Sequence, residues 1–245
     1  MEKPGKRWLS SIFALAVVAL WAPMAPSVVL SLHYDGAVQP GLKACDPALP
    51  LSVDERAELL GAVGKSETGA ALIEEYERKF GDLQTLVIQW DTVSYSQISK
   101  NPGRALASSG PRASVVCVHL AKRLPDIEHI ADLSHELVHA TRLSEAVLKG
   151  DGMSTNQFVH ARIAAIGGEA EAFGVECAVK REILGHWDHF CAPYVSGSAV
   201  EVSRVVDDLY SGALSASLTG EPYPVMLAKQ FRRMAERRAL NGILK

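Results

Sequence analysis

The stretch His135-Glu136-Leu137-Val138-His139 carries the strongest indication of both fold and chemistry in this chain. Residues four apart on an α-helix lie about 40° apart around its axis, so both imidazoles face one side and can reach one metal ion. Glu136 lies beside them, near enough to act on a water at that ion. The spacing therefore predicts a metal-binding helix.

The residues around the motif predict the helix that it needs. Asp126 follows Pro125 and can cap the N-terminus of a helix. An apolar stripe at helical spacing follows, formed by Ile130, Leu133, Leu137 and Ala140. The histidines and the glutamate of the motif mostly lie off this stripe. The alternative is a chance pair of surface histidines, but the stripe favours a helix with a core on its other face.

A catalytic zinc site needs a third protein ligand and one open position. In one zinc-binding pattern a third histidine stands six residues after the second, but Glu145 occupies that place here. The remaining choice is a carboxylate from a later helix, and the candidates are Glu169, Glu171 and Glu176.

On a helix, Glu169 and Glu171 lie on different faces. Glu169 shares a face with Phe173 and Val179, which is expected to be buried, whereas Glu171 points almost opposite. We expect Glu169 to be the ligand, with Glu171 as the alternative. Glu176 lies on the Glu169 face two turns further on, where it either holds a histidine ring or is exposed.

The run His-Glu-Leu-Val-His-Ala at 135–140 resembles the active-site helix of the zincin metallopeptidases. More weakly, residues 52–184 are similar to zincin-like peptidase domains of uncharacterised bacterial proteins, in which a Glu-x-Glu-Ala-Phe helix follows the motif helix. That segment is Glu169–Phe173 here. The spacing of Glu169 and Ala172 also resembles the third-ligand motif of several zincin families.

The resemblance implies a zinc-dependent peptidase, a hydrolase that cleaves peptide bonds with a metal-activated water. His135, His139 and Glu169 would bind Zn²⁺, and Glu136 would act as general base. The alternative function is a non-catalytic binding or assembly module with a zincin fold, tethered to the membrane. Four side chains of suitable type could stabilise the oxyanion, without a basis for choosing among them: Tyr194, His160, His186 and His189.

The predicted fold class is α+β, a mostly helical zincin-like domain with a small sheet beside the HExxH helix. Helices are expected after the caps at Ser52 and Ser66 or Thr68, and later at 157–166, 169–184, 199–214 and 225–240. Strands are expected at 83–90, 93–98 and 113–120. Peptide capture by strand addition needs an open edge. The candidate edge is 113–120, whose alternative is an ordinary interior strand.

The N-terminus is expected to stand apart from this domain. Basic residues precede an apolar run from Trp8 to about Leu32, as in a secretory signal or an uncleaved anchor. We divide the chain into a signal peptide or transmembrane anchor at 1–32, a linker at 33–50 and a metallopeptidase domain at 51–245. Both interpretations place the domain outside the cytoplasm, as a periplasmic, secreted or membrane-anchored protein.

The composition of the chain argues against one class of binding partner, nucleic acids. A net charge of -3 and 7% aromatic residues give no electrostatic or stacking basis for nucleic-acid binding. The expected partners are a peptide or protein substrate and, if the N-terminal segment is uncleaved, the membrane. Four cysteines permit two disulfides in an exported chain, of which Cys177–Cys191 is the expected pair. Buried free thiols are the alternative.

Overall fold

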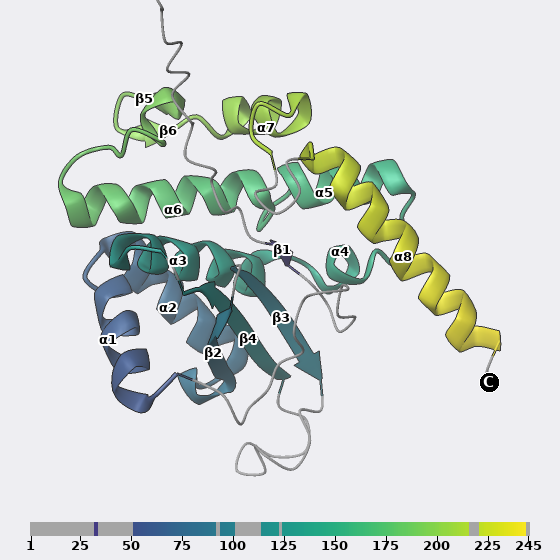
Figure 1. The fold of residues 1–245 in the computed structure, drawn as a ribbon, viewed down its shortest axis with the longest axis horizontal. Coiled ribbons are helices and arrows are strands. Elements are labelled where there is room, and N and C mark those ends of the chain that lie inside the picture. Colours follow the sequence, from purple (N-terminus) through teal and green to yellow (C-terminus); the bar gives the residue numbers. More distant parts are fainter. Residues whose placement is uncertain are drawn as a thin grey trace, which may run out of the picture.

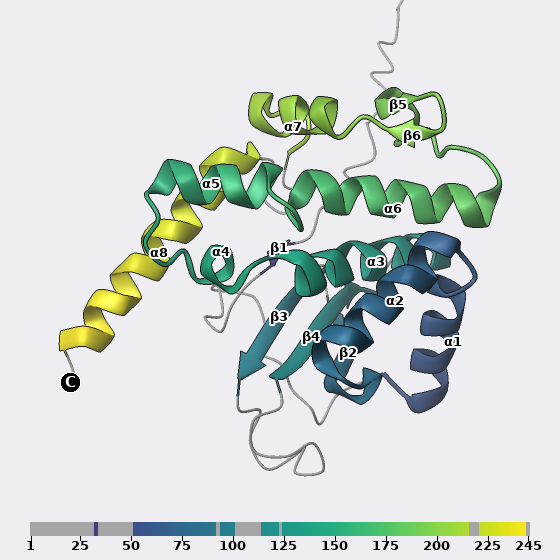
Figure 2. The ribbon, with the colours of Figure 1, turned by 180° about the vertical axis from the view of Figure 1, so that it is seen from behind.

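Helices make up most of the described chain and pack with a small sheet, giving an α+β fold (Figures 1 and 2). This computed structural model describes residues 32–33, 51–91, 94–100, 114–122, 124–215 and 221–243. The signal or anchor expected before Leu32 lies outside these residues. Within them, no helix combines the length and hydropathy that a membrane crossing requires.

The first two helices begin and end where local signals predict. Helix α1 (Val53–Val63) starts with a capping box, in which the Ser52 side chain accepts from the Glu55 N–H and the Glu55 carboxylate accepts from the Ser52 N–H. Helix α2 (Glu67–Phe80) is capped by Ser66 and ends at Gly81, whose φ of 87° is in the left-handed region that favours glycine.

The strand order of the sheet differs from one prediction made from the sequence. Its strands run in the order β1-β3-β4-β2, with bounds β1 Leu32–His33, β2 Leu86–Asp91, β3 Tyr95–Lys100 and β4 Ser114–Ala121. A 3₁₀ turn at Leu83–Thr85 occupies the start of the first predicted strand. Strand β4 pairs with β2 in parallel and with β3 antiparallel, so it is an interior strand. The expectation that 113–120 forms an open edge is therefore wrong.

Helix α3 (Asp126–Arg142) carries the motif and lies between the sheet and helix α6 (Glu169–Leu184), as both ribbon views show (Figures 1 and 2). It also contacts α1 and α2. Every residue of 131–140 is consequently buried, including the face that carries the histidines. The N-cap is Pro125 without a side-chain cap, and Asp126 is the first helical residue instead of the predicted cap.

The second half of the chain forms a helical layer on the far side of α3. Its elements are α4 Glu145–Lys149, α5 Thr155–Ala164, α6, η3 Ala192–Tyr194, β5 Val195–Ser196, β6 Ala199–Val200, α7 Val202–Ser211 and α8 Tyr223–Ile243. The predicted bounds of α6 and its stop at Gly185 are confirmed, whereas 199–200 form a strand instead of the start of a helix. The expected Cys177–Cys191 disulfide is present.

Two apolar cores meet at the layer between α3 and α6. The core on the sheet side includes Leu133, Leu137 and Ala172, and the core on the other side includes Phe173 and Tyr223. Helix α6 contributes to both cores. The polar residues of α3 and of the first turn of α6 are therefore enclosed between two apolar regions, where each buried polar group needs a specific partner.

Candidate metal centre

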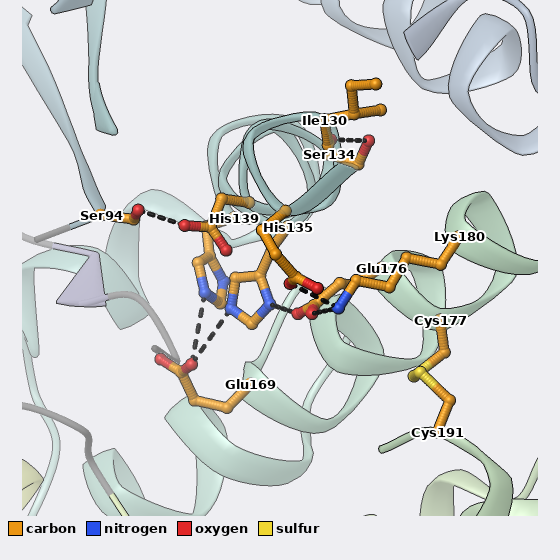
Figure 3. A network of polar contacts seen from close by, with 12 residues as sticks. Ser94, Ile130, Ser134, His135, His139, Glu169, Glu176, Cys177, Lys180 and Cys191 are labelled. Atoms are coloured by element: carbon orange, nitrogen blue, oxygen red, sulfur yellow. Dashed lines mark hydrogen bonds and ion pairs between the residues drawn. A yellow bond between two sulfur atoms is a disulfide. The ribbon is translucent and has the colours of Figure 1, made fainter. Parts of the chain in front are cut away.

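Three side chains from two helices converge between the two cores (Figure 3). The Oε2 atom of Glu169 lies 3.4 Å from Nε2 of His135 and 3.5 Å from Nε2 of His139. One ligand atom from each residue lies within 4.8 Å of the other two, and all three side chains are fully buried. The helical spacing of the histidines and the first turn of α6 together produce this cluster.

Two of the three ligand-atom separations in the cluster match those around a tetrahedral zinc ion. Bonds of about 2.0–2.2 Å from such an ion to nitrogen and oxygen keep the ligand atoms about 3.3–3.6 Å apart. The two histidine–glutamate separations fall in that interval, and the two Nε2 atoms lie within 4.8 Å of each other. Nε2 of His135 and Oε2 of Glu169 have no hydrogen-bond partner among the described residues, although both are buried. A cation would satisfy both atoms, and two imidazoles with one carboxylate are a donor set that zinc takes.

Each of the three side chains is held through its other polar atom. Nδ1 of His135 lies 3.2 Å from Oε2 of Glu176, and Nδ1 of His139 lies 2.7 Å from the Gly167 carbonyl oxygen. Nη2 of Arg162 donates to Oε1 of Glu169 over 3.3 Å. Such contacts orient imidazoles so that Nε2 faces a metal. The role in holding a histidine, one of two considered for Glu176, is the one that the geometry supports.

Glu169 and Glu171 are separated as the helical pattern predicts. The Glu171 carboxylate accepts from Nη1 of Arg142 over 2.7 Å and from the Gly167 N–H over 2.5 Å. It therefore caps the turn before α6 and stands outside the cluster. Ala172 is fully buried, and this small residue lets α6 approach the motif helix closely.

The turn between α5 and α6 sets the position of Glu169. Gly167 has a φ of 78°, and a Cβ atom there would lie 2.3 Å from the Leu143 backbone nitrogen. A Cβ atom on Gly168 would lie 2.7 Å from the Arg162 carbonyl oxygen. Because both positions exclude a larger residue, the two glycines allow the first turn of α6 to lie against the end of α3.

Glu136 is the ionisable group of the motif outside the cluster, and it is fully buried. Burial raises the pKa of Glu136 to about 8, although the His135 charge and the Ser96 hydroxyl act in the opposite direction. A carboxylate with a pKa near neutrality can both accept and return a proton. Burial together with the Glu176 charge also raises the pKa of Asp132 to about 7, and Asp132 accepts a hydrogen bond from Ser94.

The surroundings of His135 favour positive charge. Burial acts to lower the pKa of His135, but the contacts with Glu169 and Glu176 overcome this effect and raise it to about 10. In the opposite sense, burial acts to raise the pKa of Glu169, and His139 and His135 hold it well below its usual range. Without a metal, a proton on the imidazole supplies the charge that the carboxylates attract.

The side chains considered as oxyanion donors have partners elsewhere. The Tyr194 hydroxyl donates to Asp208 over 2.8 Å, and His160 lies 3.1 Å from the Tyr210 hydroxyl. Nδ1 of His186 bonds the Leu184 carbonyl, and His189 pairs with Asp188. Within the described part of the chain, the partners of these four side chains lie outside the cluster of His135, His139 and Glu169.

Three buried polar residues of this region were not predicted from the sequence. Arg162 is 1% exposed and donates to Glu169, as described above. Lys180, 3% exposed, lies 3.2 Å from Glu176 (Figure 3). It also lies 2.6 Å from Glu128. Tyr223 is fully buried at the start of α8. The Glu176–Lys180 spacing of four residues on one helix could have indicated that pair, whereas nothing local indicated the other two.

Comparison with protein-family models, curated proteins and solved structures finds no match to this chain. The functional interpretation therefore rests on the residues and their geometry.

Proposed function

We propose that this protein is a zinc-dependent peptidase of the zincin class. The observation that carries the proposal is the convergence of His135, His139 and Glu169, with two histidine–glutamate separations that suit one zinc ion. Glu136 lies next to His135 on the same helix. Two histidines, a carboxylate from a later helix and a buried glutamate in the motif are the groups that this class of hydrolase uses.

The residues then have distinct roles. A zinc ion bound there would polarise the scissile carbonyl and lower the pKa of a water molecule. Glu136 accepts the proton of the attacking water at a carboxylate oxygen and returns it to the leaving amine. Its raised pKa, about 8, suits both transfers near neutral pH. Glu176 and the Gly167 carbonyl keep the two imidazoles in place during the reaction.

A peptide substrate is favoured by the strand next to the motif helix. Strand β3 contacts α3, and the Ser96 hydroxyl of β3 acts on the Glu136 carboxylate. On its outer side, Tyr95 and Ser96 pair in parallel with Leu32 and His33. This side of β3 thus already holds a two-residue strand, and an extended peptide that continued or replaced that pairing would align its backbone beside Glu136.

The disulfides support a location outside the cytoplasm. Cys177 and Cys191 are bonded, Cys117 is also in a disulfide, and no described cysteine is free. Disulfides persist in oxidising compartments and are rare in the cytosol. We therefore propose a periplasmic, secreted or membrane-anchored protein.

One observation favours a second candidate function, a non-catalytic module that holds zinc. His135, His139, Glu136 and Glu169 each have 0% exposed surface, as in closed structural zinc sites. A peptidase must open this site to admit a substrate, whereas a binding or assembly module need not. The two candidates differ in whether Glu136 matters for any reaction.

The test compares metal content and proteolysis in matched variants. The wild type is expected to hold one zinc per chain by mass spectrometry of the metal and to cleave a library of quenched fluorescent peptides. Glu136→Gln should keep the zinc and lose activity about 10²–10⁴-fold. Glu169→Ala should lose the zinc, and Glu171→Ala, the matched control, should keep it. Zinc without cleavage by the wild type would favour the binding module. Full activity in Glu136→Gln would remove the proposed mechanism.

A further inference from the structure

The groups described so far include no donor for the negative charge that develops on the scissile carbonyl oxygen. Peptide hydrolysis usually requires one, and removing it typically slows catalysis about 10²–10³-fold. Among the described residues near the cluster, Tyr223 has the right chemistry. It comes from α8, an element that the motif does not predict.

The Tyr223 hydroxyl is buried without a partner. The residue has 0% exposed surface, and its hydroxyl has no hydrogen-bond partner among the described residues. Leaving a buried hydroxyl unpaired costs about 1–3 kcal/mol, so native structures rarely do so without a reason. A bound group that accepts a hydrogen bond during the reaction would be such a reason.

Tyr223 lies in the apolar core that also contains Ala170 and Phe173, which follow Glu169 on α6. Helix α8 packs on α5, and Arg162 of α5 donates to Glu169. Pro222, which precedes Tyr223, forms a bridge with Ser215, and its carbonyl accepts from the Val225 and Met226 N–H groups. The start of α8 is thus fixed at both the bridge and the first turn. A donor held in this way needs little reorganisation when charge develops next to it.

The charges around Tyr223 are those of the candidate site. Burial and the negative charges of Glu169, Glu136 and Glu176 raise the pKa of Tyr223 well above its usual value, with Arg162 acting in the opposite direction. The phenol therefore keeps its proton at neutral pH. A protonated, unpartnered hydroxyl in the electric field of Glu136 and Glu169 can donate a hydrogen bond to a group bound at the cluster.

We propose that the Tyr223 hydroxyl donates a hydrogen bond to the carbonyl oxygen of the scissile peptide as that oxygen becomes negative. This inference rests on the proposed peptidase function. No proton is transferred, since the phenol stays protonated before and after the step. The role differs from that of Glu136, which moves the proton of the water.

The experiment uses Tyr223→Phe in the full chain, with Tyr194→Phe as the matched control. Both variants remove one hydroxyl from a buried ring, but the Tyr194 hydroxyl is bonded to Asp208 of α7. With the best peptide from the fluorescent library, Tyr223→Phe should lower kcat about 10²–10³-fold. KM should stay within about threefold and zinc content should be unchanged. Tyr194→Phe should turn over at the wild-type rate.

A binding measurement separates this role from a structural one. A phosphinic peptide of the same sequence carries a charged oxygen where the carbonyl oxygen would be. Tyr223→Phe should bind it more weakly by about the factor lost in kcat/KM, because such analogues resemble the transition state. Wild-type kcat, unchanged phosphinic-peptide affinity or loss of zinc in Tyr223→Phe would each overturn the proposal. A wild type that cleaves no peptide would instead overturn the peptidase function, and this inference with it.

Discussion

At the scale of single residues, the candidate site consists of inner side chains held by outer ones. Each inner residue directs one atom toward the same point and gives its other atom to a fixed partner. Glu176 is the clearest example of an outer residue. It bonds His135 on one side and Lys180 on the other. Lys180 in turn contacts Glu128 of the motif helix. This chain of ion pairs links α6 to α3 across the buried layer.

Removing the outer carboxylate should weaken metal binding. Glu176→Ala deletes the group that orients His135, and we expect the zinc dissociation constant to rise about 10–100-fold. Glu176→Gln keeps a hydrogen-bond acceptor without the charge, so its loss should be smaller. The measurement is competition with a chromophoric chelator. The control is Glu182→Ala, which removes a carboxylate of the same helix that bonds to Thr68 of α2. Equal affinities in Glu176→Ala and the wild type would contradict the orienting role.

The sequence predicts those site residues whose positions follow from local helical spacing. Sequence analysis placed His135 and His139 on one helix face and preferred Glu169 to Glu171, because the two glutamates point in nearly opposite directions on one helix. It missed Arg162 and Tyr223 as neighbours of the cluster. Their nearness to Glu169 depends on how α5 and α8 pack, and no periodicity in the chain reports that packing.

At the scale of elements, the turn between α5 and α6 brings the third carboxylate to the histidines. Gly167 has two functions there, because its left-handed backbone permits the close approach to Leu143 and its carbonyl oxygen orients His139. The Gly-Gly pair predicts a helix break. The sequence does not indicate that the same turn also contacts His139 of the candidate metal centre.

A side chain at this turn should disturb both fold and site. Gly167→Ala combines a left-handed alanine with a collision against backbone atoms, so we expect it to destabilise the fold by at least about 3 kcal/mol. Zinc affinity should fall as well, since the carbonyl that orients His139 must move. Gly152→Ala is the matched control, with a φ of 68° and no atom within 4 Å of the added Cβ. It should cost only about 1–2 kcal/mol.

Chemical denaturation and zinc titration of both variants would measure these effects. A Gly167→Ala protein as stable as Gly152→Ala, with full zinc affinity, would show that the turn can relax without displacing the site.

At the scale of the whole molecule, two apolar cores enclose a layer of charged side chains. The low polarity on both sides strengthens every electrostatic interaction within the layer. Stability should therefore respond to the charge state of the site. Folding raises the pKa of Glu136 from 4.5 to about 8 and that of His135 from 6.5 to about 10.

The metal-free protein should lose stability as the pH rises. A group whose pKa is raised by folding stabilises the fold below its unfolded pKa, and this contribution disappears as the pH rises through the folded pKa. For Glu136 the window is 4.5 to about 8, and for His135 it is 6.5 to about 10. The melting temperature of the metal-free protein should thus fall between about pH 6 and pH 9.

Zinc should reverse this trend. The ion competes with the proton on His135, so the rise in melting temperature at fixed zinc should be larger at about pH 8 than at about pH 6. At a free concentration 100 times its dissociation constant, zinc adds about 2.7 kcal/mol. Calorimetry with and without zinc measures the difference, with His135→Ala as a control that should respond far less. A zinc effect independent of pH would argue against His135 as a ligand.

The elements that sequence analysis located well are those specified by neighbouring residues. The capping box at Ser52, the motif helix and the bounds Glu169–Leu184 depend on backbone hydrogen bonds and side chains within one or two turns, so a short window contains their cause. Three features depend instead on contacts between distant segments: β4 in the middle of the sheet, the complete burial of the HExxH face and the approach of Tyr223. The free energy that stabilises these three features comes from burying surfaces that meet only after the chain has folded. A short stretch of sequence contains no pattern that predicts such contacts.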